Sequence, residues 1–202
     1  MELFLLATLV AMAAWQLRAW DQGRRIALLG RYLGRYRIEK HMETLAQGYL
    51  RALGEGDPER REQIWSLLSS TEQELCSQFG RLAAEFSLAE EQETRVSTLP
   101  VYVPFAAKVL TKATFDMREA LALHARAICR AIEAGSAQSQ RSRAFTVCAE
   151  LFLMQHTCHW YCRSRTVASA RMLARHKTSY EQIIAAVLPD TRAAYSALVG
   201  RR

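Results

Sequence analysis

The chain has 202 residues, a formal net charge of +7 and a hydrophobic fraction of 50%. This length fits one compact domain with an appendage, and the composition excludes disordered and fibrous proteins. Five unevenly spaced cysteines do not make the framework of a disulfide-rich protein, and an odd number cannot all pair within the chain.

The N-terminus is apolar. Residues 3–15 carry no charge, and Thr8 is their only polar side chain. With Gln16, Leu17 and the stem of Arg18 the segment is marginally long enough to span a membrane, which needs roughly 20 residues. Trp15 and Trp20 lie where aromatic residues of a membrane–water interface are favoured. A signal peptide would carry a positive charge before the apolar stretch, where only Glu2 stands; a core or interfacial helix is the other alternative. We interpret residues 1–20 as an uncleaved membrane anchor.

Basic residues follow the anchor closely. The membrane-proximal set comprises Arg18, Arg24, Arg25, Arg31, Arg35 and Arg37. Basic residues beside a span stay on the cytoplasmic side, so we expect the N-terminus outside and residues 21–202 in the cytosol. The odd number of cysteines agrees with this, because thiols remain reduced there. Arginine binds phosphate oxygens well, which makes anionic lipid headgroups an expected partner. Its excess over lysine, 23 to 4, is typical of GC-rich bacterial genomes.

Apolar residues at helical spacing fill the rest of the chain, and only the short Val101–Val103 segment is typical of a strand. Four long amphipathic helices are expected at about residues 24–53, 58–89, 104–135 and 142–175. The second has a strong start signal, Asp57 as N-cap followed by Pro58 at the first helical position. Gly30 and Gly34 in the first favour a close approach to another helix.

The fourth long helix has a wide apolar arc, which is typical of a central helix packed by several neighbours. An exposed loop at residues 136–143 is expected before it. After it, Thr178 and Glu181 have the spacing of a capping box that begins a short helix, and Pro189 precedes a last helical segment ending at Val199. The predicted fold class is all-α: a single N-terminal anchor helix, a bundle of about four long helices and one or two short C-terminal helices.

The segment at residues 156–162 concentrates residue types that bind metals. Cys158 and Cys162 are one helical turn apart, and His159 is three residues from Cys162, so pairs of them are candidate ligands. Residues that supply further ligand types from other helices are Cys76, Cys129 and His124. Because free cysteine is among the most buried residue types, the alternative is that this cluster belongs to the core.

No catalytic constellation is found in the sequence. It lacks the glycine-rich loops Gly-x-x-x-x-Gly-Lys and Gly-x-Gly-x-x-Gly, the Gly-x-Ser-x-Gly turn and the Glu-x-x-His pairs of di-iron bundles. We therefore predict a protein that is not an enzyme, has no catalytic residues and needs no cofactor.

A second basic region lies near the C-terminus. It comprises Arg163, Arg165, Arg171, Arg175 and Lys177. Positive charge is enough for phosphate contacts, but the sequence contains no recognised nucleic-acid-reading module. An acidic protein partner or a solvated face is favoured over nucleic acid.

The anchor, the long amphipathic helices and the missing catalytic motifs together favour a non-enzymatic interaction or scaffold subunit. We expect it in a bacterial inner-membrane assembly for secretion, conjugation or envelope function, with other protein subunits and anionic lipids as partners. One alternative is a nucleic-acid or acidic-partner binding module that uses the basic regions at both ends. The other is a metal or thiol-redox protein built on Cys158, His159 and Cys162.

Overall fold

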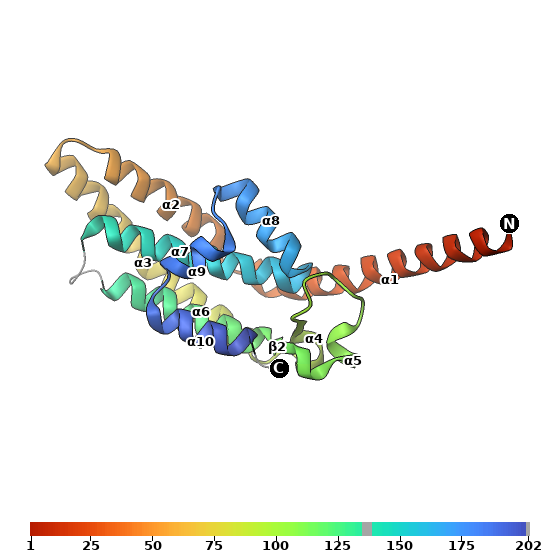
Figure 1. Cartoon of the computed structure of the whole chain (residues 1–202). Helices are drawn as coiled ribbons and strands as arrows, with labels where there is room; N and C mark the ends of the chain where they lie inside the picture. The colour runs from red at the N-terminus through yellow and green to blue at the C-terminus, as the bar shows by residue number, and fades with distance from the viewer. Residues whose placement is uncertain (135–138, 201–202) are drawn as a thin grey trace.

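A computed structural model describes residues 1–134 and 139–200, and it confirms the all-α class (Figure 1). The elements are α1 (Glu2–Leu33), α2 (Ile38–Gly54), α3 (Pro58–Phe86), α4 (Glu91–Thr94), β1 (Arg95–Ser97), α5 (Ala106–Val109), the 3₁₀ turn η1 (Thr111–Ala113), β2 (Thr114–Asp116), α6 (Met117–Glu133), α7 (Gln140–Cys162), α8 (Arg165–His176), α9 (Tyr180–Ala186) and α10 (Pro189–Val199). Strands β1 and β2 pair antiparallel with Val96 opposite Phe115.

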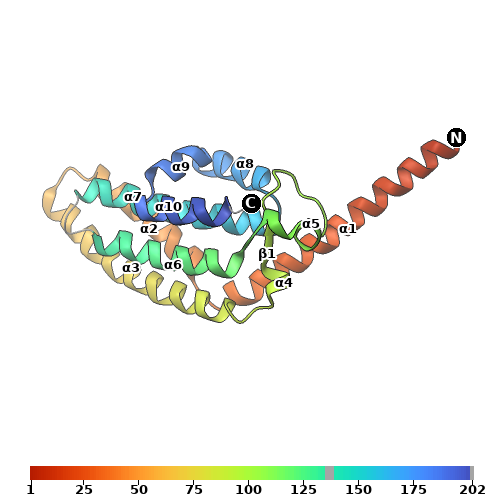
Figure 2. The ribbon, with the colours of Figure 1, turned by 60° about the horizontal axis from the view of Figure 1, so that its bottom comes forward.

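Helix α1 is one rod of 32 residues, and its N-terminal part projects from the bundle (Figures 1 and 2). Residues 1–20 are exposed throughout, and Asp21 is the first buried residue. The same helix then enters the domain, where Leu28 and Leu29 are buried.

The predicted first helix at residues 24–53 is wrong as a single element, because the chain turns between α1 and α2. Gly34 caps α1, and the Arg37 amide donates a hydrogen bond of 2.7 Å to Gln78 Oε1 on α3. This tertiary contact fixes the turn. The close helix approach predicted at Gly30 is also wrong, since a Cβ atom there would meet nothing within 4 Å.

Helices α2, α3, α6 and α7 form the bundle, with α7 at its centre. Helix α7 contacts α1, α2, α6, α8 and α9. Its buried side chains occupy several faces, among them Val147, Leu151, Leu153, Trp160 and Tyr161. The wide apolar arc in the sequence is explained by this central position.

The predicted fourth helix begins two residues from the start of α7 but extends too far at its C-terminal end, and the predicted loop at residues 136–143 is wrong over residues 140–143. Ser139 caps α7, so residues 140–143 form its first turn rather than a loop; Gly135 and residues 136–138 lie outside the described residues. The helix ends at Cys162, and α8 is a separate helix capped by Ser164, whose hydroxyl accepts from the Val167 amide at 3.2 Å. A serine N-cap stabilises a new helix start, which permits the sharp turn.

The predicted third helix begins about thirteen residues too early. Helix α6 starts at Met117, where the Asp116 side chain accepts from the Arg118 amide at 2.8 Å. Phe105 has φ of 56°, a left-handed conformation that prevents a helix from continuing past Pro104. The segment instead forms an irregular loop with α5 and η1, and the Val101–Val103 segment is not a strand.

Other helix starts follow their local signals. The Asp57 side chain accepts from the Glu59 amide at 2.9 Å and begins α3 with Pro58, as predicted. Helix α10 begins at Pro189 and ends at Val199. The capping box of α9 is formed by Ser179 and Gln182, one residue later than predicted.

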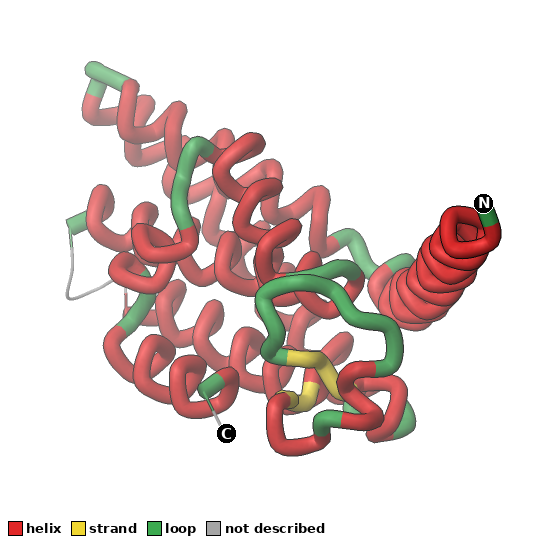
Figure 3. Tube along the Cα trace, turned by 45° about the vertical axis from the view of Figure 1, so that its right-hand side comes forward, coloured by secondary structure: helices red, strands yellow, loops and turns green. Residues whose placement is uncertain are grey.

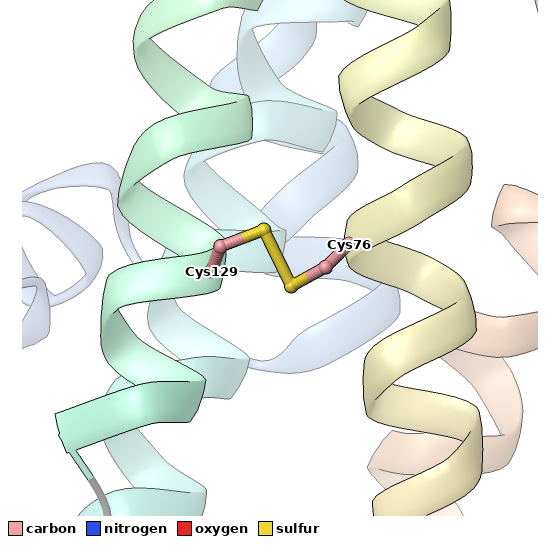
Figure 4. Close-up of a disulfide and its surroundings, with 2 residues drawn as sticks. All are labelled: Cys76 and Cys129. Carbon is pink, nitrogen blue, oxygen red and sulfur yellow. A yellow bond between two sulfur atoms is a disulfide. The ribbon is translucent and has the colours of Figure 1, made fainter.

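A disulfide joins Cys76 of α3 to Cys129 of α6, with 5.5 Å between their Cα atoms (Figure 4). Cys148, Cys158 and Cys162 are free. An odd number of cysteines is therefore compatible with one internal pair. The argument from reduced thiols for a cytosolic domain loses its basis, and the expected orientation rests on the basic residues alone.

Candidate functional site at the membrane-proximal end

The projecting part of α1 presents a continuous apolar surface. Leu3, Leu9 and Trp15 are 84%, 60% and 68% exposed. An 18-residue stretch of α1 is long and apolar enough to cross a membrane, and none of it is buried in the domain. Exposed apolar area is unfavourable in water by about 25 cal/mol per Å². The rest of the described chain does not cover this surface.

Polar contacts fasten α1 where it enters the bundle. The Tyr102 hydroxyl donates to Asp21 Oδ2, and Arg163 donates to Gln22 Oε1. Both acceptors are buried. The Arg25 guanidinium lies 3.7 Å from the Asp21 carboxylate and over the Tyr161 ring. The apolar helix is therefore held firmly by the domain at its base.

The structure does not gather the membrane-proximal arginines into one patch. Arg24 pairs with Glu93 at 2.5 Å, and Arg35 pairs with Glu85 at 2.9 Å. Arg18 lies over the Tyr102 ring at 5.7 Å. The remaining members, Arg31 and Arg37, are exposed. Arg18 to Arg31 extend over about 20 Å of α1 at 1.5 Å per residue, and Arg35 and Arg37 lie beyond its end, so only Arg18, Arg24 and Arg25 lie next to the end of the apolar segment.

The Cys/His cluster of α7 is half-buried: Cys158, His159 and Cys162 are each partly exposed, and His159 lies close to Arg171 of α8. The Cys158 thiol contacts Met154 Sδ at 3.7 Å, and burial raises its pKa above the ordinary value. Burial raises the pKa of Cys162 to about 11. Burial, together with the Arg171 and Arg175 guanidiniums, lowers the pKa of His159 to about 4. At neutral pH these are two thiols and a neutral imidazole.

No group of three or more His, Cys, Asp or Glu side chains in the described ranges is placed to hold a metal ion. Cys76 and Cys129, which the sequence offered as further ligand types, are joined in the disulfide. His124 is fully buried and bonded to Thr157. The structure thus does not bring the sequence-derived ligand types together around a common point.

The C-terminal basic region divides in two. Arg163 and Arg165 lie at the turn between α7 and α8, where the Arg165 guanidinium stacks over Trp160 at 5.4 Å and Tyr180 at 4.9 Å. The second group lies toward the other end of α8 and consists of Arg171, Arg175 and Lys177, all exposed. We call it the α8 basic group.

A groove runs between α2, α7 and α8, with a volume of about 540 Å³. This volume falls in the range of about 300–1,000 Å³ typical of ligand sites. Phe152 stacks on His176 at 4.1 Å in its wall, and His176 Nε2 bonds Gln155 Oε1 at 2.9 Å. Sequence reasoning missed the groove, because it is formed by helices that are distant in the chain.

Sequence reasoning also missed a buried polar network around Thr157 of α7. Its hydroxyl lies 3.0 Å from His124 Nε2 and 2.9 Å from the Tyr195 hydroxyl. His156, on the same helix, bonds the Ser169 hydroxyl at 3.1 Å. Burial lowers the pKa of His124 to about 3 and that of His156 to about 4, so both are neutral and tie α7 to its neighbours.

No family model, no curated protein and no solved structure matches this chain.

Proposed function

We propose that this protein is a membrane-anchored, non-enzymatic interaction subunit of a bacterial inner-membrane assembly, such as a secretion, conjugation or envelope complex. One observation carries the proposal: the apolar half of α1 is fully exposed and continues without a break into the bundle. A bilayer supplies the apolar environment that the domain does not.

The junction supports a positioning role. Because Asp21 and Gln22 of α1 are each bonded to the domain, the bundle cannot turn freely on its anchor. A domain held in this way presents its outer helices at a fixed distance from the membrane. This is what a scaffold subunit needs in order to meet other membrane proteins in register.

For the orientation we propose the N-terminus outside and the bundle in the cytosol. The supporting observation is the cluster of Arg18, Arg24 and Arg25 at the end of the apolar segment. The disulfide between Cys76 and Cys129 favours the opposite side, since disulfides persist in oxidising compartments. The arginines act during membrane insertion itself, and on that ground we place the domain in the cytosol.

A second candidate, binding of an acidic partner, has one observation in its favour. The α8 basic group has no carboxylate within ion-pair distance among the described residues. The sequence contains no recognised nucleic-acid-reading module, so an acidic protein surface is favoured over nucleic acid as the partner of these cations.

The test is purification of the C-terminally tagged full chain from detergent-solubilised membranes of its native host. We expect other membrane subunits in stoichiometric amounts, and we expect them still when residues 2–20 are replaced by an unrelated spanning helix. Recovery in the soluble fraction would contradict the anchor. Recovery from membranes without other subunits would contradict the assembly role.

The second candidate is tested in the same purification. Arg171→Glu with Arg175→Glu should lower the yield of partner several-fold, and rising salt should have the same effect on the unmodified chain. Arg51→Glu, an exposed arginine of α2, is the matched control and should leave the yield unchanged. An equal loss in both variants, or in neither, would sink the acidic-partner idea.

A further inference from the structure

The loop between β1 and β2, residues 98–113, exposes an unusual concentration of apolar side chains. Val101, Val103, Val109 and Leu110 are 61%, 46%, 78% and 46% exposed. The other exposed large hydrophobic residues described beyond residue 20 are Ile26, Leu50, Leu67, Leu88, Phe145 and Leu173. These are scattered over different elements, which is normal for a soluble surface. A cluster within ten residues of chain is not.

The loop is fastened to the bundle at its base. The Thr98 amide donates to the Ala113 carbonyl at 2.9 Å, and the Trp160 indole donates to the Ser97 carbonyl at 3.0 Å. Thr166, at the start of α8, donates its amide to the Pro100 carbonyl at 3.2 Å. These hydrogen bonds hold the loop, and with it the exposed valines and leucine, against the bundle.

The loop lies beside the root of the anchor. Figures 1 and 3 show α5 and its loop at the end of the bundle from which α1 projects. The rings of Trp20 and Phe105 are 6.0 Å apart, and the Arg18 guanidinium lies 5.7 Å from the Tyr102 ring. The loop therefore sits at the level of residues 18–21 of α1.

This level is where a bilayer surface would pass. Residues 3–20 of a helix cover about 27 Å at 1.5 Å per residue, close to the roughly 30 Å thickness of a hydrocarbon core. Trp20 is 54% exposed there, as expected for an interfacial aromatic residue. Apolar side chains beside it would reach the boundary of headgroups and acyl chains.

The charges at this end suit a lipid surface. Four carboxylates at this end are paired with arginines, in the pairs Asp21–Arg25, Glu91–Arg95, Glu93–Arg24 and Asp116–Arg118, whereas the exposed Glu90 is not in an ion pair among the described residues. By contrast, Arg18, Lys112 and Arg165 have no carboxylate within ion-pair distance in the described parts of the chain. These cations remain available to anionic headgroups.

We propose that the β1–β2 loop is a second membrane contact, in which Val101, Val103, Val109 and Leu110 enter the bilayer interface next to α1. The proposal rests on the anchoring role of α1 proposed above. Two contacts, one spanning and one interfacial, fix the tilt of the bundle on the membrane. The ligand of the loop is the phospholipid interface rather than another protein.

The experiment measures how deeply single residues of the chain lie in the bilayer. The full chain is placed in vesicles of mixed phosphatidylcholine and phosphatidylglycerol. The fluorescent residue dansylalanine is placed singly at Val109, at Leu9 in the anchor and at Leu67. Leu67 is the matched control, because it is 73% exposed on the part of α3 away from the anchor. Quenching is read with lipids that carry a nitroxide either near the headgroup or deep in the acyl chain.

We expect the probe at Val109 to be quenched several-fold more by the shallow nitroxide than the probe at Leu67, and the probe at Leu9 to be quenched by the deep one. An unquenched Val109 with a quenched Leu9 overturns the loop contact and leaves the anchor intact. If Leu9 is also unquenched, the anchor itself is wrong.

A second variant, with three serine substitutions in the loop, tests whether the probe itself drives the loop into the bilayer. Val101→Ser, Val103→Ser and Leu110→Ser remove exposed methyl groups without opening the core, and circular dichroism should show an unchanged helix content. With the probe at Val109, these substitutions should reduce shallow quenching several-fold, while Leu9 is unaffected. Unchanged quenching at Val109 would mean that the native loop does not drive the contact, and the proposal would fall.

Discussion

Glu72 of α3 illustrates how single buried charges hold the helices of the bundle. Its side chain is 3% exposed and accepts hydrogen bonds from Tyr49 at 2.5 Å and from Arg143. Three helices, α2, α3 and α7, therefore meet at one carboxylate. Sequence spacing cannot predict such a group, because its partners are 23 and 71 residues away.

Loss of one partner of this buried pair should cost more than loss of both. Arg143→Met removes the cation beside the buried Glu72 side chain and leaves it with the Tyr49 hydrogen bond alone. We expect the free energy of unfolding to fall by about 3–5 kcal/mol. Adding Glu72→Met should recover most of that loss. Urea unfolding of the detergent-solubilised chain, followed by tryptophan fluorescence, measures both. A double variant no more stable than Arg143→Met would show that the charge is not the cause.

Acid should destabilise the bundle through its buried histidines. His124 and His156 have pKa values lowered to about 3 and 4 by burial, while in the unfolded chain they titrate near 6.5. Below pH 6.5 the unfolded state binds the extra protons, so stability falls as pH drops toward 4, by up to about 1.4 kcal/mol per pH unit for each histidine. Glu150, whose pKa is raised by burial, offsets part of this.

The measurement is the urea midpoint of unfolding at several pH values from 7 to 4, for the unmodified chain and for His156→Gln. This pH range covers the titration of the histidines in the unfolded chain. The substitution should make the pH dependence shallower whatever its effect on stability at pH 7. Parallel curves for the two proteins would show that His156 does not titrate in this way.

At the scale of whole elements, the sequence predicts helices well where the signal is local. Asp57 with Pro58 and the start at Pro189 require only neighbouring residues, and both lie where expected. Prediction of an element fails where contacts with residues distant in the chain determine where the element begins, ends or forms. The turn after α1 depends on Gln78, and the short strands β1 and β2 form only by pairing with each other. The apolar N-terminal stretch of α1 was recognisable from composition, whereas the exposed apolar loop beside it was not.

The Cys76–Cys129 disulfide between α3 and α6 should contribute strongly to the stability of the oxidised protein. Cys76 and Cys129 are 53 residues apart in the chain, and closing a loop of that length in the unfolded state corresponds to about 4 kcal/mol in the chain-entropy account. Cys76→Ser with Cys129→Ser should lower the unfolding free energy by an amount of that order. Dithiothreitol should lower the stability of the unmodified chain equally and leave the double variant unchanged. A response of the double variant to the reductant would point to another cause.

At the scale of the whole molecule, three features bear on which side of the membrane the bundle would face: the apolar segment of α1, the basic residues beside it and the disulfide. Arg18, Arg24 and Arg25 follow the apolar segment directly and favour retention of the bundle in the cytosol. A reducing cytosol keeps thiols reduced, so in the cell Cys76 and Cys129 would then face each other as two free thiols. Orientation and thiol state should therefore change together.

We predict that protease added to intact spheroplasts leaves the bundle undigested, and that it is cleaved only after the membrane is opened. In the same cells, rapid alkylation should label Cys76 and Cys129, because both are reduced until the protein is exposed to air. Arg18→Glu, Arg24→Glu and Arg25→Glu together remove the charges that hold the bundle inside and should expose a fraction of it to the protease. Arg51→Glu is the control, being distant from the span in sequence, and should change nothing. Digestion in intact spheroplasts together with an unlabelled, oxidised pair would place the bundle outside, and the disulfide rather than the arginines would then report the true side of the membrane.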